Sequence, residues 1–148
     1  MRNTLFIFLA TVIFISCQKD AGEGGTSTIE GKVIYFFRVF DNVSGVFDTT
    51  FYPKSEKDVY IIYSSNEAEL YDDKFETDFN GKYRFEYLRK GDYTIMTYVD
   101  SVILNGQGEE IVSYDYPIFK KISISSNNTN NFVSDFLIEK IITDNNAN

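Results

Sequence analysis

The chain has 148 residues, with 14 Lys and Arg residues against 22 Asp and Glu residues and a formal net charge of −8 at pH 7. Aromatic residues make up 17% of it, and it contains one Cys but no His or Trp. The lack of His excludes a Ser-His-Asp or Cys-His nucleophile, a histidine general base and a His-ligated zinc site. The acidic balance argues against nucleic-acid binding, which needs clustered basic side chains. A chain of this length can form one domain whose core needs no disulfide or metal, and we predict no cofactor.

The first 16 residues have the layout of a secretory signal peptide. Arg2 precedes an apolar run from Leu5 to Ile15, which is too short to cross a bilayer comfortably because roughly 20 apolar residues are needed. Phe14-Ile15-Ser16-Cys17 resembles the lipobox of bacterial lipoproteins, in which the cysteine is lipidated and becomes the first residue of the mature protein. The resemblance implies a membrane anchor on Cys17. An ordinary signal peptide with an incidental cysteine is the alternative.

The residues that follow Cys17 have the composition of a flexible tether. Lys19-Asp20 also resembles the short charged export signal of surface-exposed lipoproteins of Bacteroidota, although any polar linker could contain this pair. We therefore expect an outer-membrane lipoprotein that is either surface-exposed or faces the periplasm. The predicted organisation is a signal peptide over 1–16, a lipidated Cys and linker over 17–27, a β-domain over 28–142 and a disordered tail over 143–148.

From Ile29 onward the apolar pattern has a period of two, and strand-favouring residues dominate. This pattern predicts an all-β fold, a single seven-stranded antiparallel β-sandwich. The expected strands are 28–40, 58–63, 70–79, 82–87, 92–99, 118–124 and 132–142. Asn80-Gly81 lies between two alternating runs and predicts a type I′ hairpin, after which Tyr83, Phe85 and Tyr87 should share one face. In the next strand, Tyr93, Ile95, Thr97 and Val99 should alternate inward. We expect the segment Ser101 to Pro117 to be a protruding hairpin or loop.

The stretch Thr77 to Ile95 contains the elements Thr-Asp, Asn-Gly, Tyr-x-Phe, Leu and Gly-x-Tyr. It resembles the core motif of carboxypeptidase regulatory-like, transthyretin-like and Cna B-type domains. Ile29 to Val33 resembles the first strand of such domains, and Asp58 to Ile62 the second. The resemblance implies a β-sandwich and says little about function, because these domains serve as spacers, adhesins, enzyme appendages and receptor domains.

Six carboxylates lie between Glu67 and Asp78. Oxygen-rich segments can hold calcium, and the candidate ligands are Asp72, Asp73, Glu76 and Asp78. The spacing lacks the Asp-x-Asp-x-Asn-Gly register of a dedicated calcium loop. A solvated acidic edge, which would oppose aggregation through a strand edge, is the alternative, and we predict no dedicated metal site.

Large apolar side chains occupy both faces of three predicted strands, although a sandwich strand should have one polar face. The second face carries Ile34, Phe36 and Phe40 on the first strand, Tyr60 and Ile62 on the second, and Met96 and Tyr98 on the fifth. The candidate ligand-face residues are Phe36, Tyr60, Ile62 and Tyr98. Either the segment Ser101 to Pro117 and the C-terminal strand cover this face, or it is an exposed apolar patch that binds a ligand.

We predict no catalytic residues, because no Gly-x-Ser-x-Gly nucleophile elbow occurs and the adjacent acids Glu109 and Glu110 would point to opposite faces of a strand. The leading hypothesis is a lipid-anchored, non-enzymatic binding or accessory module of the cell envelope, with an envelope protein or a glycan as its partner. A structural spacer or adhesin-like domain without a specific ligand is the alternative. A carboxylate-based hydrolase is a remote third.

Overall fold

The computed structural model describes residues 20–104 and 110–140, which form nine strands and no helix. Accordingly, no described segment is a helix that could cross a membrane. The predicted signal peptide, Cys17 and the tail 143–148 lie outside the described residues. The strands are β1 (Glu23–Asp41), β2 (Val46–Pro53), β3 (Asp58–Ile62), β4 (Asp73–Glu76), β5 (Lys82–Leu88), β6 (Gly91–Leu104), β7 (Glu110–Ile124), β8 (Asn130–Phe132) and β9 (Phe136–Glu139).

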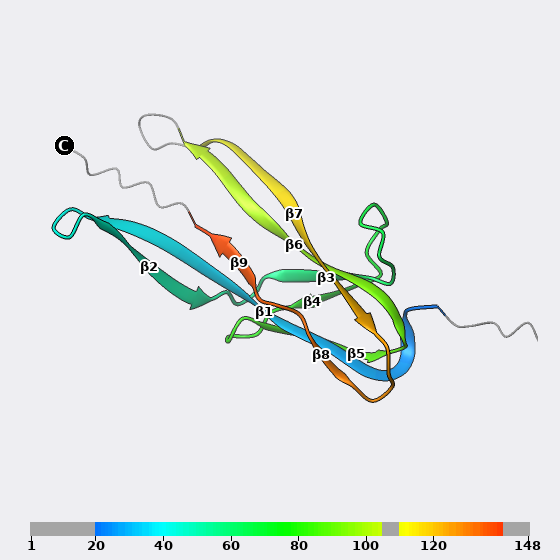
Figure 1. The fold of residues 1–148 in the computed structure, drawn as a ribbon. Coiled ribbons are helices and arrows are strands. Elements are labelled where there is room, and N and C mark those ends of the chain that lie inside the picture. Colours follow the sequence, from blue (N-terminus) through cyan, green and yellow to red (C-terminus); the bar gives the residue numbers. More distant parts are fainter. Residues whose placement is uncertain (1–19, 105–109, 141–148) are drawn as a thin grey trace, which may run out of the picture.

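The strands form two sheets that make a β-sandwich (Figure 1). In the first sheet, β1 pairs antiparallel with β5 along its first half and with β2 along its second half, and it pairs parallel with β8 and β9. The second sheet is antiparallel, in the order β4-β3-β6-β7. The all-β sandwich is confirmed, but the prediction of seven antiparallel strands is wrong. After β7 the chain returns to the first sheet and runs in the direction of β1, so its last two strands must pair parallel.

The core lies between the sheets and consists of alternate residues from their facing sides. Its largest fully buried side chains include Tyr83, Tyr93 and Phe136, and Ile95 and Val99 lie in the same cluster. Burial of such side chains contributes about 1.5–3 kcal/mol each. The period-two pattern therefore identified the inward positions of β6 correctly.

Two long hairpins project from the sandwich, and the sequence pattern identified only one of them. The strands β6 and β7 pair as far as Leu104 and Glu110, so the segment Ser101 to Pro117 is a hairpin whose apex, 105–109, lies outside the described residues. No strand was predicted over Val46–Pro53, yet these residues form β2, paired with β1 from Ile34 to Asp41. The β1–β2 hairpin turns at Gly45, which has a φ of 73°.

The turn before β5 differs from the predicted type I′ hairpin. Such a turn needs positive φ at both central residues, whereas only Gly81 of the Asn80-Gly81 pair has one. Asp78 organises the turn, since its carboxylate accepts hydrogen bonds from the backbone N–H groups of Asn80 (2.8 Å) and Lys82 (2.9 Å). The turn carries the chain from β4 in one sheet to β5 in the other.

The alternation along β5 also breaks before its end. Tyr83 and Phe85 are buried as expected, but Tyr87 is 69% exposed and Leu88 is buried in its place. Tyr87 has a φ of 59°, a conformation that is uncommon for a residue with a side chain. This irregularity moves the inward position from residue 87 to residue 88.

Part of the predicted linker belongs to the folded domain, because β1 begins at Glu23. The Arg89 guanidinium donates hydrogen bonds to the carbonyl oxygens of Asp20 (2.9 Å) and Glu23. The Tyr93 hydroxyl accepts a bond from the N–H of Gly22 (2.9 Å) and donates one to the carbonyl of Arg89 (2.7 Å). Residues 20–23 are thereby tied to the end of the sandwich where β6 begins.

Candidate functional site

The outward side of the β1–β2 hairpin and of the neighbouring strand β9 carries a row of apolar side chains that are half-buried or solvent-exposed. We call Phe36, Phe47, Phe51 and Leu137 the hairpin face. Phe51 lies directly opposite Phe36 across the β1–β2 pair, with ring centroids 5.6 Å apart. Phe47, Phe51 and Leu137 are 62%, 58% and 57% exposed. Exposed apolar groups gathered in this way are typical of an interaction surface.

The hairpin face results from strict alternation along three strands. Tyr35 of β1, Tyr52 of β2 and Ile138 of β9 turn toward the core and are buried or half-buried. Their neighbours in the sequence therefore turn outward. On the same outward side, Arg38 forms an ion pair with Glu139 (2.6 Å). Both side chains are partly exposed, so this pair contributes little to stability.

β2 is an edge strand, because within the described residues it pairs only with β1. Natural proteins protect exposed edges with lysine, proline, bulges or a covering segment. In β2 no Lys is present, and its one Pro, Pro53, stands at the last position. Seven of its eight residues are exposed. The hairpin face thus borders a long strand edge that has little protection.

The other three candidate ligand-face residues lie on the second sheet. Tyr60 of β3 packs against Tyr98 of β6, with ring centroids 5.8 Å apart, while Ile62 is fully buried. The segment 63–72 lies over this face. The Tyr71 ring is 4.6 Å from that of Tyr60, and the Ser64 carbonyl accepts a hydrogen bond from the Thr94 hydroxyl (2.8 Å).

The segment 63–72 therefore covers most of this side of the second sheet. The segments that were expected to cover it were Ser101 to Pro117 and the C-terminal strand. Asp72 fastens the covering segment, because its carboxylate accepts a hydrogen bond from the N–H of Tyr63 (2.6 Å) and its own N–H donates to the carbonyl of Ile61 (2.8 Å). Glu67 adds an ion pair with Lys121 of β7 (3.1 Å).

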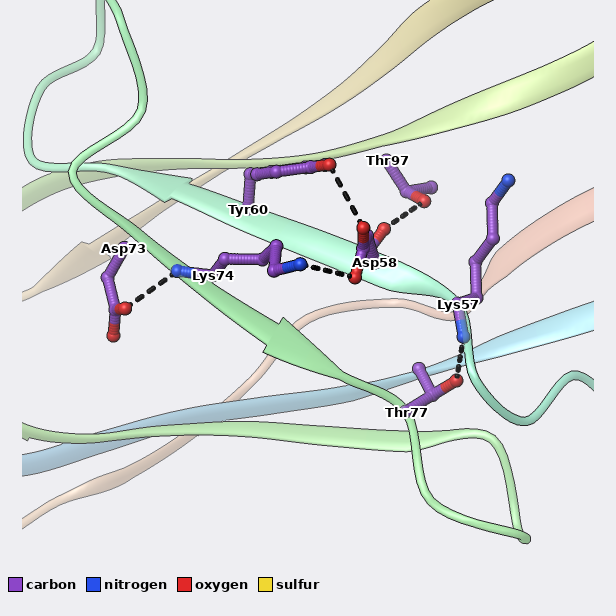
Figure 2. A network of polar contacts seen from close by, with 7 residues as sticks. All are labelled: Lys57, Asp58, Tyr60, Asp73, Lys74, Thr77 and Thr97. Atoms are coloured by element: carbon purple, nitrogen blue, oxygen red, sulfur yellow. Dashed lines mark hydrogen bonds and ion pairs between the residues drawn. The ribbon is translucent and has the colours of Figure 1, made fainter.

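Asp58 is the centre of a polar network on the same side of the second sheet (Figure 2). Its carboxylate accepts a hydrogen bond from the Tyr60 hydroxyl (3.2 Å) and pairs with the Lys74 ammonium (3.1 Å), and its carbonyl accepts a bond from Thr97 (2.7 Å). Burial, and then the Asp58 charge, raise the pKa of Tyr60, so its hydroxyl stays protonated at neutral pH. The network connects β3 with β4 and β6, and this role is structural.

The four calcium candidates do not converge on a common point. Asp73 accepts a hydrogen bond from the N–H of Lys74 (2.7 Å), while Asp72 and Asp78 bind backbone N–H groups in two separate turns. Glu76 pairs across the sheet with Asp58. Within residues 20–104 and 110–140, no group of three or more His, Cys, Asp or Glu side chains is placed to hold a metal ion.

The structure therefore separates Phe36 from Tyr60, Ile62 and Tyr98 and places it beside residues that the sequence analysis did not single out. Those residues are Phe47, Phe51 and Leu137. A detectable signal existed, because positions 47, 49 and 51 carry Phe, Thr and Phe between the turn residue Gly45 and Pro53.

Comparison with known proteins gives little beyond the fold. No protein-family model matches the chain, and no curated protein matches it. Among solved structures, the chain is similar to a protein from Pseudomonas aeruginosa described as a "putative carbohydrate binding protein". The identity is 13%, the TM-score is 0.47, and the match covers 81% of this chain and 92% of that one. A likeness this distant carries no information about what this chain binds, and the resemblance to carboxypeptidase regulatory-like and related domains stays a prediction.

Proposed function

We propose that the chain is a lipid-anchored, non-enzymatic binding module of the bacterial cell envelope that captures a partner protein on the hairpin face. The observation that carries this proposal is the exposure of Phe47 and Phe51 on the edge strand β2. Aromatic side chains are enriched at the centres of protein interfaces. The Cys17 anchor is part of the proposal and rests on the lipobox resemblance.

The open edge of β2 favours a protein partner over a glycan. An edge strand presents a row of backbone N–H and C=O groups, and the backbone of an added strand matches that row. The neighbouring phenylalanines would supply apolar contact on one side of such a strand. The face lacks the dense array of polar side chains that a sugar would need, since Arg38 and Glu139 already pair with each other.

The position of the β1–β2 hairpin suits a partner that approaches from the side opposite the membrane. Cys17 is three residues before Asp20, so the anchor lies within about 11 Å of the folded domain. The 19 residues of β1 extend over roughly 60 Å at about 3.3 Å per residue. Figure 1 shows the start of β1 at one end of the molecule and the β1–β2 turn at the other.

A double substitution, Phe47→Ser with Phe51→Ser, tests the proposal. Both side chains are more than half exposed, so the fold should persist while the apolar contact is removed. We expect the amount of partner protein retained from detergent-solubilised envelopes to fall at least tenfold, as a loss of about 1.4 kcal/mol would require. Circular dichroism and thermal unfolding of both proteins verify the fold.

Phe79→Ser is the matched control, because Phe79 is 81% exposed and lies in the turn between β4 and β5. Its retention of the partner should equal that of the wild type. Equal retention by the double variant would overturn the proposal. If the wild type retains no partner specifically, the structural-spacer alternative is favoured instead.

A further inference from the structure

A hollow lies beside β1, outside the hairpin face, where β8 ends and β9 has not yet begun. β8 pairs with Thr28–Glu30 and β9 with Val33–Phe36, so neither of these two strands pairs with Gly31 and Lys32, which among the described strands pair only with β5 on the other side of β1. The space has a volume of about 300 Å³, at the lower end of the range for ligand pockets. It is lined by Glu30, Gly31, Lys32, Lys82, Tyr83, Phe132, Val133 and Asp135.

Tyr83 reaches this hollow from the core. Its side chain is 1% exposed, and its hydroxyl has no hydrogen-bond partner within residues 20–104 and 110–140. The hydroxyl lies against Gly31, where any Cβ would collide with it. Burial, and then the charge of nearby Asp135, raise the pKa of this hydroxyl, so it stays protonated and can donate. A buried donor without an acceptor is costly, and Tyr83 is one of the residues that line the hollow.

Four charged side chains surround the hollow. The acids Glu30 and Asp135 balance the bases Lys32 and Lys82, so the lining carries no net charge. None of these four side chains takes part in an ion pair or a side-chain hydrogen bond within the described part of the chain. They therefore keep their capacity to bind donors and acceptors of a ligand.

Phe132 completes the lining with an apolar surface, and its side chain is 72% exposed. It pairs with Glu30 across the β1–β8 ladder, which places a ring next to a carboxylate. An exposed ring beside unpaired polar groups offers one apolar and one polar surface to the same ligand.

We propose that this hollow binds one sugar ring of an uncharged saccharide. The C–H side of a sugar ring would stack on Phe132, and its hydroxyl groups would exchange hydrogen bonds with the four charged side chains. The Tyr83 hydroxyl would donate to a sugar oxygen at the bottom of the hollow. The balanced charge favours a neutral ligand over an anion or a cation, and the volume admits a monosaccharide.

The test is a titration of the isotope-labelled mature domain with glucose, galactose, mannose and N-acetylglucosamine, followed by amide chemical shifts. Binding of at least one sugar should shift the amides of Gly31 and Val133 in a saturable manner. Tyr83→Phe should weaken the affinity about tenfold, because it removes one hydrogen bond to a buried group. Phe132→Ala should abolish saturation. Glycine is the zwitterionic probe and should leave the shifts unchanged.

Phe79→Ala is the control for loss of an exposed ring elsewhere and should bind as the wild type does. The Phe47 and Phe51 double variant should also keep full sugar affinity, so the failure of either proposal is distinguishable from failure of the other. The saccharide proposal is overturned if none of the four sugars causes saturable shifts, if glycine does so in their place, or if Phe132→Ala binds as tightly as the wild type.

Discussion

Two buried tyrosines, Tyr83 and Tyr93, differ in whether their hydroxyl group has a hydrogen-bond partner. This difference decides how a substitution changes the stability of the protein. Tyr83 and Tyr93 are both almost fully buried. The Tyr93 hydroxyl bonds to Gly22 and Arg89, whereas that of Tyr83 has no partner in the described part of the chain. The same change from Tyr to Phe should therefore affect the two positions in opposite directions.

In the absence of ligand, Tyr83→Phe should raise the free energy of unfolding by about 1 kcal/mol, because it removes an unsatisfied buried donor. Tyr93→Phe should lower it by about 1–2 kcal/mol, because the buried N–H of Gly22 and the Arg89 carbonyl lose a partner. Urea denaturation monitored by circular dichroism measures both changes. A loss of more than 1 kcal/mol in Tyr83→Phe would mean that its hydroxyl is already satisfied in the free protein.

At the scale of the strand, the period-two pattern correctly identified most of the residues that share a face, with Tyr87 as an exception. It predicted the inward positions of β6, and the burial of Tyr93, Ile95 and Val99 confirms them. It did not reveal β2, because neither side of this projecting strand is well buried, so Phe, Thr and Phe at positions 47, 49 and 51 were not set off by a sustained polar–apolar contrast.

Periodicity also could not show which strands share a sheet. Phe36 and Tyr60 both belong to a second apolar face of their own strands, yet β1 and β3 lie in different sheets. Strand order depends on contacts between distant segments. For the same reason, the sequence did not reveal the hollow, which brings β1 and β5 together with residues 132–135 near the C-terminus.

The tip of the β1–β2 hairpin should be sensitive to acid. Hydrogen bonds from the Ser44 hydroxyl and then from the N–H of Val43 hold the pKa of Asp41 below its usual 3.8. A lowered folded-state pKa means that the stabilising contacts are complete above about pH 4 and are lost as the pH falls through the folded pKa. The hairpin turn should therefore loosen only below about pH 4.

The amide shifts of Val43 and Ser44 measure this transition, and their midpoint should lie below 3.8. Asp41→Asn keeps an acceptor oxygen and removes the titration, so the shifts should then be independent of pH in this range. A midpoint at or above 3.8 in the wild type would contradict the role of Asp41 as the acceptor that closes the turn.

For the whole molecule, the proposed anchor predicts where the protein resides in the cell. Two or more acyl chains hold a protein stably at a membrane, whereas one chain does so only marginally. The wild type should incorporate a labelled fatty acid and sediment with membranes. Cys17→Ser should lose the label and move to the soluble fraction with its fold unchanged by circular dichroism. A wild-type protein without label would contradict lipidation at Cys17.

The proposed partner binds at the far end of the molecule from this anchor. A photo-crosslinking phenylalanine analogue at position 51, introduced in the cells that produce the protein, tests that placement most directly. Tyr87, which is 69% exposed on β5, provides the matched control position. We expect one discrete adduct with another protein from position 51 and no adduct of that mass from position 87. No adduct from position 51, or the same adduct from both positions, would contradict that placement.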